Sequence, residues 1–351
     1  MTPTGGSRAA PFPARDDLEA PSVVEASSLR KTFGETVAVD GLSLHLGSHE
    51  LYGLVGPDGA GKTTTVRMLA GLTTPDRGEA MVLGRPSHKG QTEVREAIGY
   101  MPQLYSLYGD LSVDENLRFF GQLFGLRRKV FQKRRGRLLS ITRLARFGSR
   151  RADALSGGMY KKLALACALL HKPRILLLDE PTNGVDPVSR RELWDLLYEF
   201  VDEGMAVLVT TPYMDEAEKC HRVGLIHEGR ILEEGPPMKL VESFQHEVYL
   251  LSGPHGLELE EAIHRRREVL AVTPRGASLK VEIRGGFAEH FSAWLKDEAP
   301  QMSLSNTSPD FEDVFLGLMA QREGDNEKEK REGEEGERRK DHQGGNQEPA
   351  S

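Results

Sequence analysis

A short glycine-rich segment, residues 56–64, is the first part of the chain whose composition predicts chemistry. It follows the apolar run Leu51–Val55 and precedes the helix-compatible stretch Val66–Leu72. Glycines allow successive backbone N–H groups to point at one anion, and a helix N-terminus adds its positive end. In such a loop Lys62 would reach the β- and γ-phosphates of a nucleotide, and the Thr63 hydroxyl would hold Mg²⁺. We therefore predict a P-loop made of Gly56, Pro57, Asp58, Gly59, Ala60, Gly61, Lys62, Thr63 and Thr64.

The simpler alternative, a glycine-rich turn that only begins a helix, accounts for neither the Lys-Thr pair nor the apolar run before it. A P-loop does not define one reaction, because kinases, GTPases and motor ATPases share it. The other polar clusters of the chain must distinguish between these classes.

Two adjacent carboxylates end a second apolar run, Arg174–Pro181. A buried strand of this kind delivers its last residues to the edge where doubly wound sheets bind ligands. We predict that Asp179 coordinates Mg²⁺, directly or through water, and that Glu180 acts as general base on the water that attacks the γ-phosphate. The alternative is a capped strand end without a ligand.

A Ser-Gly-Gly sequence stands just before the apolar helical stretch Leu163–Leu170. Ser156, Gly157 and Gly158 would then lie at a helix N-terminus, where a hydroxyl and free N–H groups can bind an anion. Taken alone, such a sequence is as often a helix N-cap with no ligand. Its position ahead of Asp179 favours a second phosphate site.

These clusters lie in a long stretch in which short apolar runs alternate with helical segments. The alternation is typical of an α/β domain with a largely parallel sheet, which we place at residues 21–244. Residues 1–20 are rich in Pro, Gly and Ala, and residues 321–351 are almost wholly polar and charged. Both ends are predicted to be disordered, because they bury too little apolar surface to offset the entropy of ordering.

Residues 245–320 are predicted to form a small α+β domain. The expected order is β-α-β-β-α-β, which suggests a ferredoxin-like fold. A last helix is expected to follow, with Ser308 as its N-cap, Pro309 in its first turn and an end near Ala320. The expected elements are the strand Glu247–Leu251, the helix Leu257–Arg265, the hairpin Val269–Val272 with Leu279–Ile283, the helix Phe287–Leu295 and the strand Met302–Ser305.

Composition limits the remaining possibilities. The chain has 351 residues with 38% apolar residues, and no apolar run approaches the roughly 20 residues that cross a bilayer. Its formal net charge of −7 argues against a general nucleic-acid binder. Cys167 and Cys220 form no metal-ligand pattern and are interpreted as packing thiols. We expect a cytoplasmic protein without a secretory signal.

The order of P-loop, Gln103, Leu155–Met159, Asp179-Glu180 and Asp186 resembles the nucleotide-binding domain of ABC transporters. The resemblance covers about residues 22–244. It implies an α/β P-loop NTPase fold, in which a RecA-like core carries an antiparallel β subdomain and an α-helical subdomain. It implies ATP and Mg²⁺ as cofactors, with Phe33 stacking on adenine and Gln103 reaching both Mg²⁺ and the attacking water.

The resemblance also implies partners. Two nucleotide-binding domains would form a head-to-tail dimer, hetero- or homomeric, with each ATP between one P-loop and the other domain's Ser156 motif. Asn183–Pro187 would be a contact loop of that dimer. Motion would pass to an integral-membrane permease through the helical region between Gln103 and Ser156, which would place the chain at the inner face of the plasma membrane. The basic residues from Arg127 to Arg137 could meet anionic headgroups or a partner loop, or form a solvated helix face.

One departure from the family pattern concerns the reaction itself. The family has a histidine after the strand that follows the catalytic Glu, and here that position is Pro212. Proline offers neither an imidazole nor an N–H. Losing one preorganised transition-state contact costs on the order of 10² to 10³ in rate, so slow turnover is expected. Tyr160 and Lys161 also stand where the family usually has Lys and Gln.

Gly184–Pro187 and Ser308–Phe315 resemble the ABC-2-type multidrug exporter branch, in which some domains with an altered switch residue pair with an intact one. The first hypothesis is therefore an ATPase motor that drives export of a drug or lipid-like cargo through a separate ABC-2-type permease. The second is an ATP-dependent dimerisation or regulatory subunit that hardly hydrolyses ATP. A GTPase is disfavoured because no Asn-Lys-x-Asp segment follows the P-loop. A ribosome- or DNA-associated ATPase is disfavoured because no second such domain or coiled-coil insertion is present.

Overall fold

The computed structural model describes residues 22–104 and 107–322. Tertiary contacts divide the chain into two compact units, with the division after Pro237. The sequence placed this boundary at residue 244, so residues 238–244 fall in the second unit. The two expected disordered ends lie outside the described residues, apart from residues 321 and 322, which are helical.

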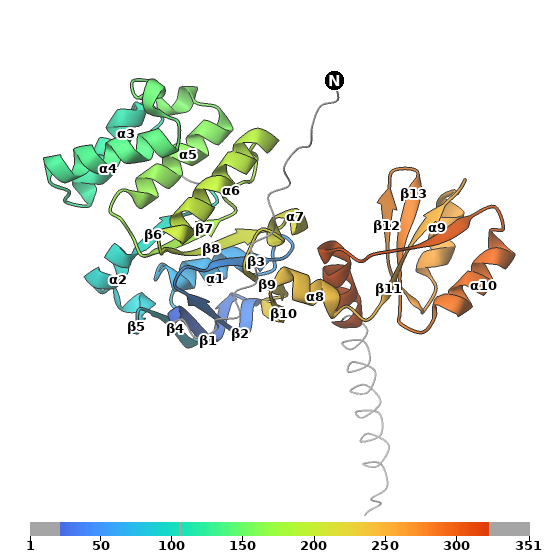
Figure 1. Cartoon of the computed structure of the whole chain (residues 1–351). Helices are drawn as coiled ribbons and strands as arrows, with labels where there is room; N and C mark the ends of the chain where they lie inside the picture. The colour runs from blue at the N-terminus through green and yellow to red at the C-terminus, as the bar shows by residue number, and fades with distance from the viewer. Residues whose placement is uncertain (1–21, 105–106, 323–351) are drawn as a thin grey trace, which may run out of the picture. The chain divides into compact units, whose positions relative to one another are not determined.

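A six-stranded sheet organises the first unit (Figure 1). Its strand order is β10-β9-β3-β8-β7-β6, and the strands from β9 to β6 are mutually parallel. The central strands are buried along their whole length, as expected for a sheet covered on both faces. The bounds are β3 Leu51–Val55, β6 Ile98–Met101, β7 Ile175–Asp179, β8 Ala206–Thr211, β9 Arg222–His227 and β10 Arg230–Gly235.

A second, antiparallel sheet has the order β2-β1-β4-β5. Its inward side chains join those of β3 and α1 in one apolar core. The P-loop therefore leaves the central sheet beside a rigid antiparallel layer. The bounds are β1 Ser22–Phe33, β2 Thr36–Gly47, β4 Arg77–Val82 and β5 Arg85–Pro86.

The helices of this unit follow the strands or form a separate helical region between β6 and β7 (Figure 1). Helix α1 is Lys62–Leu69, α2 Thr92–Ala97, α6 Pro187–Asp202 and α7 Met214–Ala217. Helix α8, Pro237–Glu242, begins at the last residue of this unit, and its other residues belong to the second. The helical region contains α3 Val113–Leu123, α4 Arg128–Ile141 and α5 Gly157–Leu169, with short 3-10 turns η2 Ala145–Phe147 and η3 Ala152–Ala154; η1 Ser87–Lys89 lies before α2. The expected fold, a RecA-like core with an antiparallel β layer and a helical subdomain, is confirmed.

The second unit has the expected β-α-β-β-α-β order. Its antiparallel sheet runs β12-β13-β11-β14, so the first and third of its strands lie at the centre. Residues from α9 and α10 form one apolar core with alternate side chains of β11 and β13. The bounds are β11 Glu247–Ser252, α9 Leu257–His264, β12 Val269–Arg275, β13 Ser278–Ile283, α10 Ala288–Glu298 and β14 Ser303–Thr307.

A last helix, from residue 311 to at least residue 322, lies against the other side chains of β13. The prediction that Ser308 is the N-cap of this helix was wrong. Asp310 takes that role, because its Oδ1 accepts the N–H groups of Glu312 (3.1 Å) and Asp313 (3.2 Å). The Asp310 N–H in turn donates to Asp313 Oδ2, which closes a reciprocal cap. Both residues also meet Lys280 of β13, a nonlocal contact that fixes where the helix begins.

Candidate nucleotide-binding site

Lys62 begins α1 directly after β3 and the glycine-rich loop, and its side chain is only 3% exposed. The ammonium donates to the carbonyls of Gly56 (2.8 Å) and Pro57 (2.9 Å), which fold the loop around it. It also lies 3.3 Å from Glu180 Oε1. The cation thus lies within the loop and is paired with the carboxylate of the residue that follows β7, two strands away from β3 in the sheet.

The loop needs glycine at Gly61, where φ is +104°. A Cβ there would lie 2.4 Å from the carbonyl oxygen of Ala38 in the antiparallel layer. This close approach lets the backbone turn into α1, so that the helix begins with its N–H groups directed into the loop.

Asp179 ends β7 and is fully buried. Its Oδ1 accepts hydrogen bonds from the Thr63 hydroxyl (3.0 Å) and the Thr210 hydroxyl (2.8 Å). Its Oδ2 is buried without a hydrogen-bond partner among the described residues. A buried, unsatisfied carboxylate oxygen beside a threonine hydroxyl suits Mg²⁺, which takes one or two carboxylate ligands together with nucleotide phosphates and water.

Glu180, the next residue, is 4% exposed and has a positive φ of 47°, a backbone conformation that residues other than glycine rarely adopt. Its N–H is held by the backbone oxygen and the hydroxyl of Thr210. Its carboxylate accepts the amide of Gln103 (2.7 Å) and that of Asn183 (3.3 Å) at Oε2. The strained turn therefore aims the carboxylate into the same cluster as Lys62.

Several of the predicted site residues are brought together in this cluster: Lys62, Thr63, Gln103, Asp179 and Glu180. Sequence reasoning missed three of their neighbours, Thr210, Asn183 and Lys161. A signal for Thr210 was available, since two threonines end an otherwise apolar strand at Thr210 and Thr211.

Lys161, on α5, donates to the backbone oxygen of Gln103 (3.1 Å). Burial lowers the pKa of Lys161, although the negative charges of Glu180 and Asp179 oppose that shift. Beside it, the Tyr160 hydroxyl accepts the N–H of Leu107 (2.8 Å). Tyr160 and Lys161, which depart from the usual family sequence, thus connect α5 to Leu107 and to Gln103.

The Ser-Gly-Gly motif lies elsewhere in the unit, at the N-terminus of α5. Ser156 is the N-cap, as expected, and accepts the Met159 N–H at 3.4 Å. Gly158 faces α6 so closely that a Cβ would lie 2.2 Å from Ser189 Oγ. Within the described residues no hydrogen bond joins the motif to the phosphate loop of the same chain.

Phe33, predicted to stack on adenine, ends β1 and is 54% exposed. Its ring has the Lys31 ammonium 5.6 Å from its centroid. The ring is therefore accessible from solvent, although no contact of Phe33 with the phosphate loop is found in the described part of the chain.

Pro212 lies between β8 and α7, in a turn held by its neighbours. The buried Glu216 carboxylate accepts the hydroxyls of Thr211 (2.6 Å) and Thr182 (3.0 Å), and the Thr211 hydroxyl accepts the Tyr213 N–H (3.1 Å). His221 cannot serve as a substitute imidazole, because its Nδ1 accepts the N–H of Leu51 at the opposite end of β3.

A parallel sheet with a strand–loop–helix phosphate cradle after β3, and two acids at the C-terminal end of β7 in the same sheet, defines a P-loop NTPase. Residues 39–183 match the ABC transporter family. Two curated relatives agree with that match, and the chain belongs to the ATP-binding proteins of ABC transporters, an ABC-type ATPase family.

The first relative is "Probable multidrug ABC transporter ATP-binding protein YbhF" of Escherichia coli (strain K12), 40% identical over 85% of this chain and 52% of that relative. The chain thus spans about half the length of this protein. The second is "Nod factor export ATP-binding protein I" of Paraburkholderia xenovorans (strain LB400), 37% identical over 85% of this chain and 97% of that one. Among solved structures, the "Dimeric Structure of MJ0796, a Bacterial ABC Transporter Cassette" is similar with a TM-score of 0.56 and 26% identity, over 61% of this chain and 98% of that one.

None of the helices in residues 22–104 and 107–322 has the length and apolarity needed to span a membrane.

Proposed function

We propose that this chain hydrolyses ATP to power export through a separate membrane permease of the ABC-2 type. The observation that carries the proposal is the single cluster in which Lys62, Thr63, Gln103, Asp179 and Glu180 meet. We propose a drug or lipid-like cargo; the names of the relatives, which mention multidrug transport and Nod factor export, support export as the direction of transport.

In the proposed reaction Lys62 leaves Glu180 and binds the β- and γ-phosphates, since a triphosphate attracts the ammonium more strongly than one carboxylate does. Glu180, released from that ion pair, accepts the proton of the attacking water. Gln103 and Asn183, which already touch the Glu180 carboxylate, orient the base and the water.

Thr63, Asp179 and Gln103 would hold Mg²⁺, which supplies charge neutralisation to the phosphates. The buried Asp179 Oδ2, which has no hydrogen-bond partner among the described residues, supports this role. Adenine would stack on the exposed ring of Phe33.

The remaining phosphate contacts would come from a second nucleotide-binding domain. Ser156, Gly157 and Gly158 present N–H groups at the start of α5, and in the described part of the chain no hydrogen bond joins them to the phosphate loop. A head-to-tail dimer, as homo- or heterodimer, would place this motif over a partner's ATP, and the dimeric state of the similar solved cassette supports such an arrangement.

The permease would dock on the helical region near Gln103. Leu104 is 88% exposed, and Tyr108 and Phe119 are exposed with ring centroids 4.6 Å apart. An exposed apolar group beside the catalytic glutamine gives a partner direct access to the site. Through the permease the chain would be held at the cytoplasmic face of the membrane.

A second candidate follows from Pro212. No imidazole is available there to contact the γ-phosphate, so the chain could bind ATP and dimerise while an intact partner hydrolyses. In that case it would be a regulatory subunit, and Glu180 would contribute little to turnover.

Steady-state ATP hydrolysis by the full chain, by Pro212→His and by Lys62→Ala tests the two candidates. A motor turns over well above Lys62→Ala, and Pro212→His adds little. If the wild type equals Lys62→Ala while Pro212→His restores turnover, the regulatory function is supported and the motor function is rejected.

A further inference from the structure

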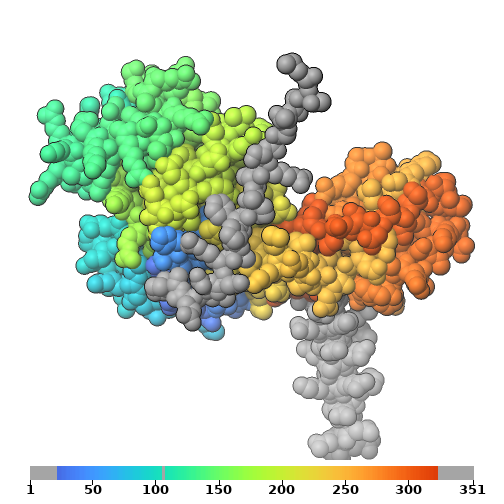
Figure 2. All heavy atoms as spheres, in the orientation of Figure 1, coloured from blue at the N-terminus to red at the C-terminus, as the bar shows by residue number. Residues whose placement is uncertain are grey.

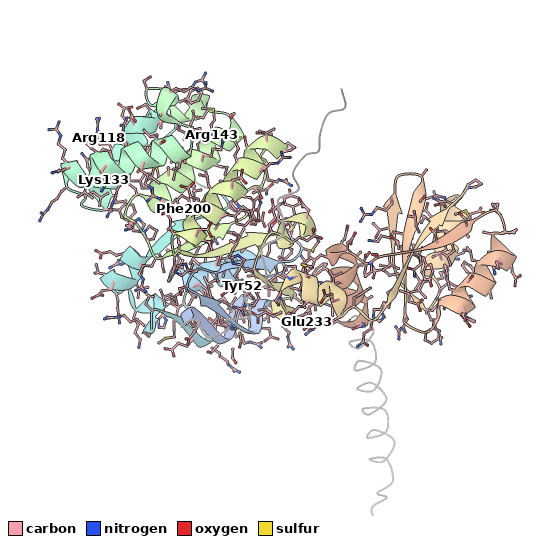
Figure 3. The ribbon with its side chains drawn as sticks, viewed as in Figure 1. Tyr52, Arg118, Lys133, Arg143, Phe200 and Glu233 are labelled. Carbon is pink, nitrogen blue, oxygen red and sulfur yellow. The ribbon has the colours of Figure 1, made fainter. Side chains whose placement is uncertain are left out.

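One stretch of the first unit has an extreme charge. Residues 118–151 contain twelve Lys or Arg and no Asp or Glu, in a chain whose net charge is −7. The stretch covers most of α3, all of α4 and the turn after it. Arg118, Lys133 and Arg143 are labelled on this helical region in Figure 3, and Figure 2 shows its outer surface in green.

Several of these cations have partners within the unit. Arg135 pairs with Asp114, Arg137 with Glu203 and Arg143 with Glu192, and Arg134 donates to the carbonyl of Leu170. These four cations therefore help to hold the helical region together.

Four others do not. Arg127, Arg128, Lys129 and Lys133 are exposed, and no carboxylate lies within salt-bridge distance of them in the described chain. They gather where α3 turns into α4, and Lys129 and Lys133 lie one helical turn apart on the same face. We call these four residues, with Leu123 and Val130, the α3–α4 tip.

The tip also exposes apolar surface. Leu123 is 66% exposed and Val130 39% exposed, while their neighbour Phe124 stacks on His171 (ring centroids 4.1 Å apart). Phe124 therefore anchors the turn, and Leu123 and Val130 face solvent. A helix that serves only as a solvated face normally mixes charges of both signs and exposes few large apolar groups.

Cations flanking exposed aliphatic side chains fit an anionic lipid surface. The side chains enter the headgroup layer, and the cations meet the lipid phosphates. A nucleic acid fits less well, because the aromatic ring of this turn, Phe124, is already stacked on His171 and the rest of the chain is acidic. We propose that the α3–α4 tip binds the surface of an anionic membrane directly, independently of any permease.

Sedimentation of the full chain with vesicles tests this proposal without a permease. The chain should bind vesicles that contain phosphatidylglycerol and not vesicles of phosphatidylcholine alone, and high salt should weaken the binding. Each Lys or Arg near an anionic leaflet strengthens binding about fivefold, so the triple variant Arg128→Gln, Lys129→Gln, Lys133→Gln should bind about 100-fold more weakly. Leu123→Ser with Val130→Ser should remove the part of the binding that persists in high salt.

The matched control removes the same charge elsewhere on the first unit. Arg85, Lys89 and Arg95 are exposed near α2, and their joint replacement by Gln should leave vesicle binding unchanged. Circular dichroism of each variant establishes that it is folded. Absence of wild-type binding to phosphatidylglycerol vesicles, or equal loss in both triple variants, would overturn the proposal and leave a protein loop as the partner of these cations.

Discussion

At the scale of single residues, Glu180 is both the ion-pair partner of Lys62 and the proposed general base. Nucleotide must break the ion pair before the carboxylate can act as the base. Its carboxylate is paired with Lys62 and accepts the Gln103 amide, while its backbone holds a strained positive φ. The strain is maintained by two bonds to Thr210, so the base is positioned before substrate binds.

The first prediction concerns the base. Glu180→Gln should retain ATP binding and lose about 10² to 10³ in single-turnover hydrolysis, because an amide cannot accept the water's proton. Nucleotide binding by fluorescence and hydrolysis by phosphate release measure the two effects separately. Glu199→Gln, an exposed change on α6, is the control. Equal rates for wild type and Glu180→Gln would contradict the role of this carboxylate.

The second prediction concerns Thr210, whose hydroxyl bonds Asp179 and the Glu180 N–H. Thr210→Val keeps the shape but leaves the buried Asp179 with one fewer donor, which should cost about 1 to 3 kcal/mol of stability. The apparent Mg²⁺ requirement for hydrolysis should also change. Urea unfolding and Mg²⁺ titration test this, with exposed Thr92→Val as the control. Unchanged stability and unchanged Mg²⁺ dependence would show that Thr210 only fills space.

At the scale of elements, α3 begins with a complete capping box. The Ser112 hydroxyl accepts the Glu115 N–H (3.2 Å), and the Glu115 carboxylate accepts the Ser112 N–H (2.8 Å). This cap fixes the entry of the helix that follows the Gln103 segment.

The third prediction is that Ser112→Ala costs about 1 kcal/mol at this helix start. Hydrogen exchange of the first turn of α3 should become about fivefold faster, while Ser140→Ala on α4 should not change it. The hydrogen bonds from Ser112 lower the pKa of Glu115. The contribution of the Glu115 carboxylate is therefore present above its ordinary pKa and is lost as the pH falls through the lowered value. The difference between wild type and Ser112→Ala should shrink in acid to the part that comes from the Glu115 N–H bond. A difference of equal size at neutral and acid pH would exclude the carboxylate from the cap.

At the scale of the whole molecule, each unit has an apolar core of its own. The sheet of the second unit also buries charged side chains on its other face. Glu282 of β13 is 2% exposed, and burial together with the nearby Asp313 charge raises its pKa to about 9. Lys280 on the same face pairs with Asp310 and Asp313.

The fourth prediction follows from that raised pKa. Below the ordinary value of 4.5, Glu282 is protonated in both the folded and the unfolded chain. Between 4.5 and about 9 the unfolded chain ionises while the folded unit keeps its proton, so stability falls as the pH rises. Glu282→Gln should therefore stabilise the second unit at pH 8 and have little effect at pH 4.

Trp294 fluorescence during urea unfolding, in a Trp194→Phe background, reports on the second unit alone because the chain has two tryptophans. Exposed Glu289→Gln on α10 is the control. A stabilisation that does not grow between pH 4 and pH 8 would show that Glu282 is ionised in the folded protein.

Several local features of the structure follow from the sequence alone. The P-loop with its strand and helix, the Ser156 N-cap and the β-α-β-β-α-β order all depend on residues close together in the chain. Local periodicity, turn residues and hydrogen bonds between residues three apart act before any tertiary contact forms, so they can be read from a short window.

Contacts between residues far apart in the chain were set only by the tertiary structure. Lys62 meets Glu180 across 118 residues of chain, and Thr210 meets Asp179 across adjacent strands. The last helix begins at Asp310 rather than Ser308 because the helix start must also satisfy Lys280. Which polar side chains share a buried cluster depends on strand order and register, and these are set by the packing of the whole core rather than by local propensity.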